Sequence, residues 1–466
     1  MHYIDGRDSR RFNIKKTSTK RPQATLQLLS RAPLPGSTKT TPRFIGGDAL
    51  QGSVILRCHT PVNIHSIKLT LKGNARTRDA VAYSPVNEHT FLDCSYLLYS
   101  RKTSGNPRWN GQCNTSRNKE SDGTLHGSYS FPYYFPFPTS SEWKPLPTEN
   151  TSKAGPASPV LSYSPPPSFS ENGSSWSVSY KLGMVVTHGA LRSKSKTTTE
   201  IIYLPRRVSP PASERRQAAY REGALIPGPC VDPNGWYTFC PWQSPYVARS
   251  LRFHFDQLSS PSVQLSYTRG TVIPCYMKLS SPDISFLNAL ASPRAVNLAL
   301  FRTISHSQMG QGISSIDKSA PLVSAVWWSP PKTEFPLDAG KRHLEGEVHL
   351  SKTMVSSCDF PLFNIEYTLA LLPFTIPSFK STLDLSSDHA SHPEYDNRDH
   401  RQLLKCTVEI TTFHEYGPIP VSFTSPASGN GSVRKEKKEG YGEDIPLWAQ
   451  ETKTASTLPS VSHGWT

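Results

Sequence analysis

Long hydrophobic runs are missing from this 466-residue sequence. No apolar stretch approaches the ~20 residues that a helix needs to cross a bilayer. The first 43 residues contain no apolar core followed by a cleavage site, so we expect no secretory signal. These two absences predict a cytoplasmic protein without a transmembrane helix.

Closely spaced cysteines are also missing. The eight cysteines are scattered between positions 58 and 406 without a C-x-x-C pair. A secreted disulfide scaffold or a structural zinc site needs tighter and patterned spacing. Cys58 and Cys275 stand inside strand-like runs, where a free thiol behaves as a small buried hydrophobe. We therefore predict free cysteines, of which these two are buried.

Catalytic signatures are absent as well. The sequence has no G-x-S-x-G elbow, no G-x-x-x-x-G-K-[ST] phosphate loop and no H-E-x-x-H. The densest ionisable cluster, residues 388–400 (DHASHPEYDNRDH), has the residue types for a divalent metal. A metal site needs ligands fixed by surrounding structure, and this Ser- and Asp-rich segment is typical of a solvated loop. We expect a non-enzyme without cofactor or metal, and keep the metal site as the lesser alternative.

Positive charge is abundant, and so is proline. The formal net charge is +15, and residues 1–43 carry ten Lys or Arg against two Asp. The main interpretation of this leader is a solvated, disordered segment. Attraction to anionic lipid is the alternative, whereas nucleic-acid binding is disfavoured because stacking aromatics are not interleaved with the charges. The 42 prolines favour β-structure with long polar loops over a helical bundle.

Period-2 alternation of apolar and polar residues predicts a series of β-strands. Between Arg43 and Arg78, we expect a turn at Gly46-Gly47, a strand from Gly52, a break at Thr60-Pro61 and a strand over 64–72. Short helices are predicted over 212–222 and 284–291, the second capped by Ser281 or Asp283. Further strands are expected over 90–99, 176–187, 195–204, 251–258, 295–304, 343–350, 361–369 and 403–412. Residues 263–283 are expected to form two strands, with a turn at Gly270 between them and a bulge at Pro274.

The order of these motifs resembles that of the arrestin-like proteins, most closely the arrestin-related adaptors of fungi. The resemblance begins with Gly-Gly, a Gly-started strand, Pro and SIKLTLKG, and continues with FPYYFPFP, PPPSF and the strand WSVSYKLGMVVT. In the second part of the chain it includes VQLSYTRGTVIPCYMKL, HLEGEVHL and PLFNIEYTL. The resemblance implies an all-β fold of two consecutive immunoglobulin-like β-sandwich lobes, with disordered tails and long loop insertions.

On this basis we divide the chain into five parts. They are a disordered basic leader (1–42), an N-terminal β-sandwich (43–205) with insertions at about 100–126 and 141–164, an inter-lobe connection (206–250), a C-terminal β-sandwich (251–412) with insertions at about 305–340 and 373–402, and a disordered tail (413–466).

The resemblance implies a non-enzymatic adaptor that links plasma-membrane or endosomal proteins to a HECT-type ubiquitin ligase or to endocytic machinery. Such ligases read Pro-Pro-x-Tyr with WW domains, because Pro presets an extended helix that docks between aromatic rings. This chain has no full copy. Its nearest approach is His392-Pro393-Glu394-Tyr395, so Pro393, Glu394 and Tyr395 are the candidate docking motif. A retromer-type structural trafficking subunit and a basic lipid-binding module are the alternatives.

Basic residues near the first two strands are candidates for binding acidic or phosphorylated cytoplasmic tails of membrane proteins. They are Arg57, Lys68, Lys72, Arg76 and Arg78. The alternation places Lys68 and Lys72 opposite the apolar face, hence in solvent. The tail adds Lys435, Lys437 and Lys438 as candidates for lipid binding or for ubiquitin attachment, between which the sequence does not decide.

Overall fold

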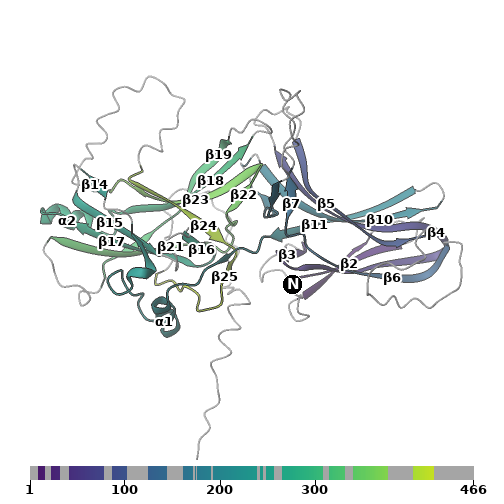
Figure 1. Ribbon diagram of the computed structural model, residues 1–466, viewed down its shortest axis with the longest axis horizontal. Coiled ribbons are helices and arrows are strands. Elements are labelled where there is room, and N and C mark those ends of the chain that lie inside the picture. Colours follow the sequence, from purple (N-terminus) through teal and green to yellow (C-terminus); the bar gives the residue numbers. More distant parts are fainter. Residues whose placement is uncertain are drawn as a thin grey trace, which may run out of the picture.

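The protein consists mostly of β-structure. The computed structural model describes residues 9–15, 23–31, 41–77, 87–101, 124–143, 161–171, 174, 176–189, 193–238, 242–244, 248–256, 265–307, 314–330, 340–375 and 402–424. In these residues there are twenty-five β-strands, two α-helices and one 3-10 helix. The all-β prediction is therefore confirmed at this level. In Figure 1 the strands that precede residue 205 gather toward one end of the long axis and the later ones toward the other.

The first eleven strands, here called the N-terminal half, form a nine-stranded sheet and a separate two-stranded pair, β7–β8. In the large sheet, β3 and β11 pair in parallel and the other pairs are antiparallel. The strands are β1 (Ser9–Lys15), β2 (Gln23–Arg31), β3 (Arg43–Ile45), β4 (Ala49–Thr77), β5 (Asn87–Ser100), β6 (Thr124–Pro136), β7 (Ser141–Trp143), β8 (Leu161–Tyr163), β9 (Phe169–Ser170), β10 (Trp176–His188) and β11 (Ser193–Leu204).

Strand β4 corrects the predicted break at Thr60-Pro61. It runs for 29 residues without interruption, and the pairing with β6 instead shifts register between Cys58 and Val62. A β-bulge of this kind bends a strand and absorbs residues that do not fit the ladder, so the proline is tolerated. Gly52 also lies within the strand and does not start it. A Cβ atom there would stand 2.1 Å from the carbonyl oxygen of Gln27 on β2, which only glycine avoids.

The predicted disordered leader is wrong for the residues that the structure describes. β1 pairs with β2, and β2 pairs with β4 over residues 51–57. Along β2 every second side chain is buried, including Leu26 and Leu28, which are fully inaccessible. The high net charge of the leader favours disorder, but its short alternating run QATLQLLSR buries enough apolar surface to order this segment.

The C-terminal half consists of two six-stranded sheets. One contains β13 (Trp236–Thr238), β14 (Trp242–Ser244), β15 (Ala248–Asp256), β17 (Val272–Ser280), β20 (Val326–Trp328) and β21 (Lys341–His349). The other contains β16 (Leu265–Thr268), β18 (Asn297–Ser307), β19 (Ser314–Ser324), β22 (Cys358–Phe360), β23 (Phe363–Leu372) and β24 (Leu404–Thr411). Between the halves, β12 (Val208–Ser209) pairs in parallel with β25 (Phe413–His414).

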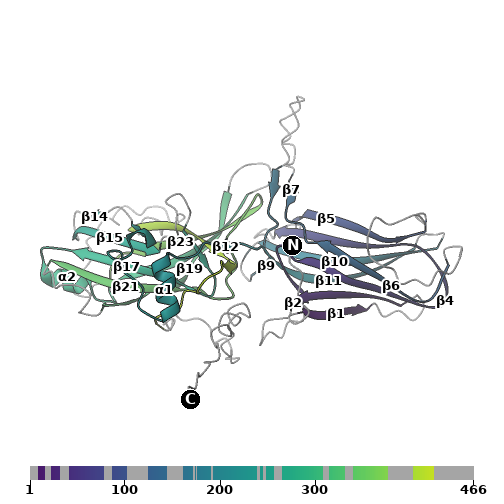
Figure 2. The same ribbon diagram turned by 60° about the horizontal axis from the view of Figure 1, so that its bottom comes forward.

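Both predicted helices are present, as Figure 2 shows. α1 (Glu214–Glu222) begins after Ser213, whose side chain accepts a hydrogen bond from the Arg216 amide, and ends at Gly223 in the left-handed conformation. α2 (Ile284–Leu290) begins after Asp283, which accepts from the Phe286 amide. Of the two predicted caps for this helix, the structure thus selects Asp283. The 3-10 helix η1 (Pro233–Gly235) leads into β13.

Three further boundaries need correction. The expected insertion at 305–340 contains the end of β18 and all of β19 and β20. β19 pairs with β18 alone, and an edge strand accommodates its Pro321 next to a register shift. In the expected connection (206–250), β13, β14 and the start of β15 already belong to a sheet. The described start of the expected disordered tail, residues 413–424, forms β25 and a segment bonded to β21.

The core is one cluster of buried side chains that includes residues of both halves. On β10 the predicted apolar face is confirmed, since Val178, Tyr180, Leu182, Met184 and Val186 are at most 3% exposed. Cys58 and Cys275 are buried free thiols, as predicted. Among the described residues, no helix is long and apolar enough to cross a membrane.

The packing of β2 leads to a test with a matched control on the same strand. Leu28→Ala should lower the free energy of unfolding by about 2–5 kcal/mol, because it leaves a cavity at a fully buried position. Leu29→Ala, on the opposite and half-buried face, should cost clearly less. Urea unfolding measures both, and equal effects would show that β2 is not part of the core.

Candidate functional site

Several predicted site residues lie outside the described residues. These are the docking candidates Pro393, Glu394 and Tyr395, the tail lysines Lys435, Lys437 and Lys438, and Arg78; the ionisable cluster over 388–400 lies there too. In the part of the chain that the structure does describe, no group of three or more His, Cys, Asp or Glu side chains is arranged to hold a metal ion.

The remaining anion-binding candidates do not form one site. Lys72 Nζ lies 2.8 Å from Asp93 Oδ2 on β5, and Arg76 Nη2 lies 3.2 Å from Glu88 Oε1. Exposed ion pairs of this kind contribute little stability, about 0–1 kcal/mol, but each neutralises the charge that an anionic ligand would need. Arg57 pairs in register with β2 and β6, whereas Lys72 and Arg76 pair with β5 and β10.

Lys68 lies instead on a surface with other lysines. In the antiparallel ladder it stands opposite Val185 on β10, which stands opposite Lys196 on β11. Residues directly opposite in such a ladder share one face of the sheet. Lys68, Lys194 and Lys196 are exposed. The prediction that Lys68 faces solvent is confirmed, and its neighbours make this sheet face basic.

A second basic cluster lies where the two halves meet, and the sequence did not indicate it. Arg302 on β18 extends its Nη2 atom to within 2.6 Å of Glu171 Oε2, which follows β9 in the N-terminal half. Arg269, directly after β16, donates through Nη1 to the Met354 carbonyl at 3.2 Å. Arg43 lies on β3 of the N-terminal half, and its positive charge acts on Arg269. We call Arg43, Arg269 and Arg302 the arginine cluster.

The cluster carries excess positive charge in a poorly hydrated place. Burial, followed by the charge of Arg43, lowers the pKa of Arg269 to about 10, and burial also lowers the pKa of Arg43. Tyr367 supplies no negative charge, because burial raises the pKa of its hydroxyl to about 12 and this group donates to the Val355 carbonyl. Within the described part of the chain, Glu171 is the carboxylate paired with the cluster.

Arg302 is the member of the arginine cluster that lines a large groove. Its volume is about 1720 Å³, and both Glu171 and Arg302 line it. The wall from the N-terminal half comes from residues 168–171, and the opposite wall from α1, the segment 349–355 and the segment 417–422. Arg221 and Lys352 also line the groove. An anionic chain of extended shape would therefore meet cations along its length.

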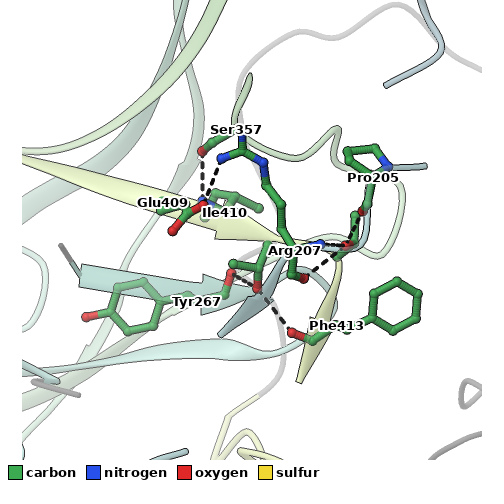
Figure 3. A network of polar contacts seen from close by, with 9 residues as sticks. Pro205, Arg207, Tyr267, Ser357, Glu409, Ile410 and Phe413 are labelled. Atoms are coloured by element: carbon green, nitrogen blue, oxygen red, sulfur yellow. Dashed lines mark hydrogen bonds and ion pairs between the residues drawn. The ribbon is translucent and has the colours of Figure 1, made fainter. Parts of the chain in front are cut away.

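A network of hydrogen bonds fixes the connection between the halves, as Figure 3 shows. Thr412 Oγ1 donates to the Pro205 carbonyl at 2.6 Å and accepts from the Arg207 amide at 2.9 Å. The Arg207 guanidinium in turn lies 2.9 Å from Glu409 Oε1 on β24. Alongside, Thr411 Oγ1 donates to the Tyr267 carbonyl, and the Ile410 amide donates to Ser357 Oγ.

This network ties the end of β11 to the last strands of the C-terminal half. Its hydrogen bonds join residues about 200 positions apart, such as Arg207 and Thr412. Because buried polar groups without partners are costly, the geometry of the connection is well specified.

Comparison with known proteins does not identify a family. No protein-family model matches the chain, and no curated protein matches it. The arrangement of charges must therefore supply the functional argument.

The importance of Thr412 for the connection is testable. Thr412→Val keeps the shape but removes the hydroxyl, which leaves the Pro205 carbonyl and the Arg207 amide without this partner. We expect a loss of about 1–3 kcal/mol in unfolding free energy and faster proteolysis near residue 207. Thr407→Val, at an exposed site on β24, is the control and should change neither. Normal stability of the Thr412 variant would contradict the assigned role.

Proposed function

We propose that the protein is an arrestin-like adaptor with two β-sandwich lobes, and that it binds acidic or phosphorylated cytoplasmic tails of membrane proteins. The observation that carries this proposal is the arginine cluster at the junction of the two halves. Arg43 and Arg269, one from each half, lie close enough for their charges to interact. Arg302, which is paired with Glu171, lines a groove large enough for an extended peptide.

The energetics of the cluster favour a ligand. Arg43 and Arg269 are partly buried like charges, and neither has a carboxylate at ion-pair distance among the described residues. Such an arrangement costs folding energy unless an anion compensates it. A phosphate group matches the planar guanidinium well, because two N–H groups donate to two oxygens at once.

The adaptor role further requires an effector. For this we retain Pro393, Glu394 and Tyr395 as the candidate ligase-docking motif. The motif is attributed to the resemblance of the sequence to arrestin-related adaptors, in which WW domains of HECT-type ligases read Pro and Tyr in extended segments.

Binding of a tail can be measured by fluorescence anisotropy with a labelled acidic peptide, unphosphorylated and phosphorylated. The phosphorylated form should bind at least about 10-fold more tightly, and Arg43→Gln should remove most of that gain, since charge-assisted hydrogen bonds contribute about 1.5–3 kcal/mol each. Lys405→Gln, at an exposed position on β24, is the control. The Arg43 variant should also keep or gain thermal stability, because it relieves repulsion with Arg269.

Two results of this experiment would count against the proposed site. Equal binding of both peptides would exclude a phosphate-selective site. The lipid-binding module would be favoured if the protein bound anionic vesicles and not the peptides, and if substitution of Lys68, Lys194 and Lys196 weakened the vesicle binding.

Ligase recruitment is tested separately in cells. We expect the tagged protein to co-purify a HECT-type ligase and Tyr395→Ala to abolish this recovery. Tyr416→Ala, at a tyrosine that is 97% exposed, should have no effect. If the ligase still co-purifies with the Tyr395→Ala variant, its docking site lies elsewhere on the chain. Absence of ligase from every sample would favour a structural trafficking subunit.

A further inference from the structure

A buried carboxylate on β21 holds the last described residues of the chain. The side chain of Glu347 is 2% exposed. It accepts hydrogen bonds from the Phe423 amide at 3.0 Å, the Thr424 amide at 2.6 Å and the Thr424 hydroxyl. We call residues 421–424 the strap. Two consecutive amides and a hydroxyl thus converge on one carboxylate of the sheet.

His349 completes this polar site. Its Nε2 atom lies 3.1 Å from Glu347 Oε1 and 3.2 Å from Thr424 Oγ1. A buried carboxylate needs several donors to offset its lost hydration. Glu347 therefore has a strong requirement for a bound segment that presents amide and hydroxyl donors in this geometry.

The strap meets the polar requirement of the site but fits its apolar part poorly. Val421 is 63% exposed and Phe423 is 61% exposed. The centroid of the Phe423 ring lies 5.1 Å from the centroid of the Trp328 ring. Next to it remains a cavity of about 140 Å³, whose lining includes Trp236, Tyr276 and Trp328 together with the strap residues Val421 and Phe423. Hydrophobic burial, which stabilises most peptide complexes, is thus largely unused by the strap.

We propose that Glu347, His349 and the adjoining cavity form a peptide-binding site that the strap occupies in cis. Its ligand is an extended segment of another protein in which an apolar residue precedes Ser or Thr. The amides supply sequence-independent donors, the hydroxyl requires Ser or Thr, and the apolar residue enters the cavity that Phe423 leaves unfilled. Glu345 also lines the cavity, so a phosphorylated or acidic segment is repelled.

This site differs from the proposed tail-binding groove in sign, although the two adjoin, since His349, Val421 and Ser422 also line the groove. The arginine cluster selects anions, whereas the site at Glu347 rejects them. Occupation by the strap lowers the apparent affinity for a ligand in trans by the fraction of molecules in which the site is free. Because the strap makes few apolar contacts, a peptide with a better-fitting apolar residue can displace it.

The test uses the full chain and a labelled peptide of residues 417–428, GPIPVSFTSPAS. Phe423→Ala combined with Thr424→Ala weakens the strap in cis, and this chain should bind the peptide at least about 10-fold more tightly than the unaltered protein. Adding Glu347→Gln should remove this gain, whereas adding Glu222→Gln at an exposed position of α1 should not. Peptide phosphorylated on its threonine should not bind.

Hydrogen exchange provides a second measurement on the unaltered chain. Excess unlabelled peptide should displace the strap and accelerate exchange of the Phe423 and Thr424 amides. The proposal is overturned by unchanged exchange, or by peptide affinity that is independent of Glu347. Arg43→Gln should leave peptide binding intact, so failure here is distinguishable from failure of the tail-binding proposal.

Discussion

The architecture of the N-terminal half depends on the hydrogen-bond ladder of β4. Its first part, residues 49–63, pairs with β2 and β6, and its second part, residues 64–77, pairs with β5 and β10. A single strand thus fixes the register of four others. The bulge between Cys58 and Val62 divides β4 into two parts with separate pairing registers. Both registers must be correct, because a shift by one residue would turn every side chain to the opposite face of the sheet. The close approach of β2 at Gly52 is part of the same constraint.

The junction between the halves follows a different principle, because polar contacts dominate there. Arg207, Thr412 and Glu409 satisfy one another across the connection. The positive charge of the arginine cluster is less well compensated. Among the described residues, Arg302 is paired with Glu171, and no second carboxylate is paired with the cluster. Satisfied polar groups specify a unique geometry, whereas uncompensated charges mark a place where a ligand completes the electrostatics. The contrast between these two neighbouring sets is the basis for proposing a tail-binding site there.

Much of the β-structure could be predicted from local alternation, and the failures have physical causes. The strands over 176–187 and 195–204 and both helices were found because their patterns are strictly local. Strand β2 is not predicted, because the basic residues around it favour disorder, whereas the segment is ordered by the burial of Leu26 and Leu28. β19 was missed because its polar, proline-containing sequence is compatible with strand structure only at a sheet edge, and topology decides that position.

The candidate site was less accessible from the sequence. Arg43 and Arg269 are 226 positions apart, and no spacing rule connects them. The sequence does give one indication of the site. In the strand alternation, Arg302 falls on the same face as Leu298, Leu300 and Ile304, which are buried. A cation on a buried face needs an anionic partner, and Glu171 is that partner here. Glu347 gives no such signal in HLEGEVHL, because it alternates with the buried Leu344 and Val348 and shares its parity with Glu345 and His349, which are not fully buried.

The two proposed sites adjoin but differ in charge, which would suit one molecule with two peptide partners. As proposed, the groove selects negative charge and the site at Glu347 rejects it, so neither ligand would compete well for the other position. Residues 417–422 nevertheless line the groove and continue into the strap. Displacing the strap from Glu347 would therefore also alter a wall of the groove. Because the same short segment contacts both places, binding at one proposed site would change the shape of the other, and such coupling would act equally in both directions.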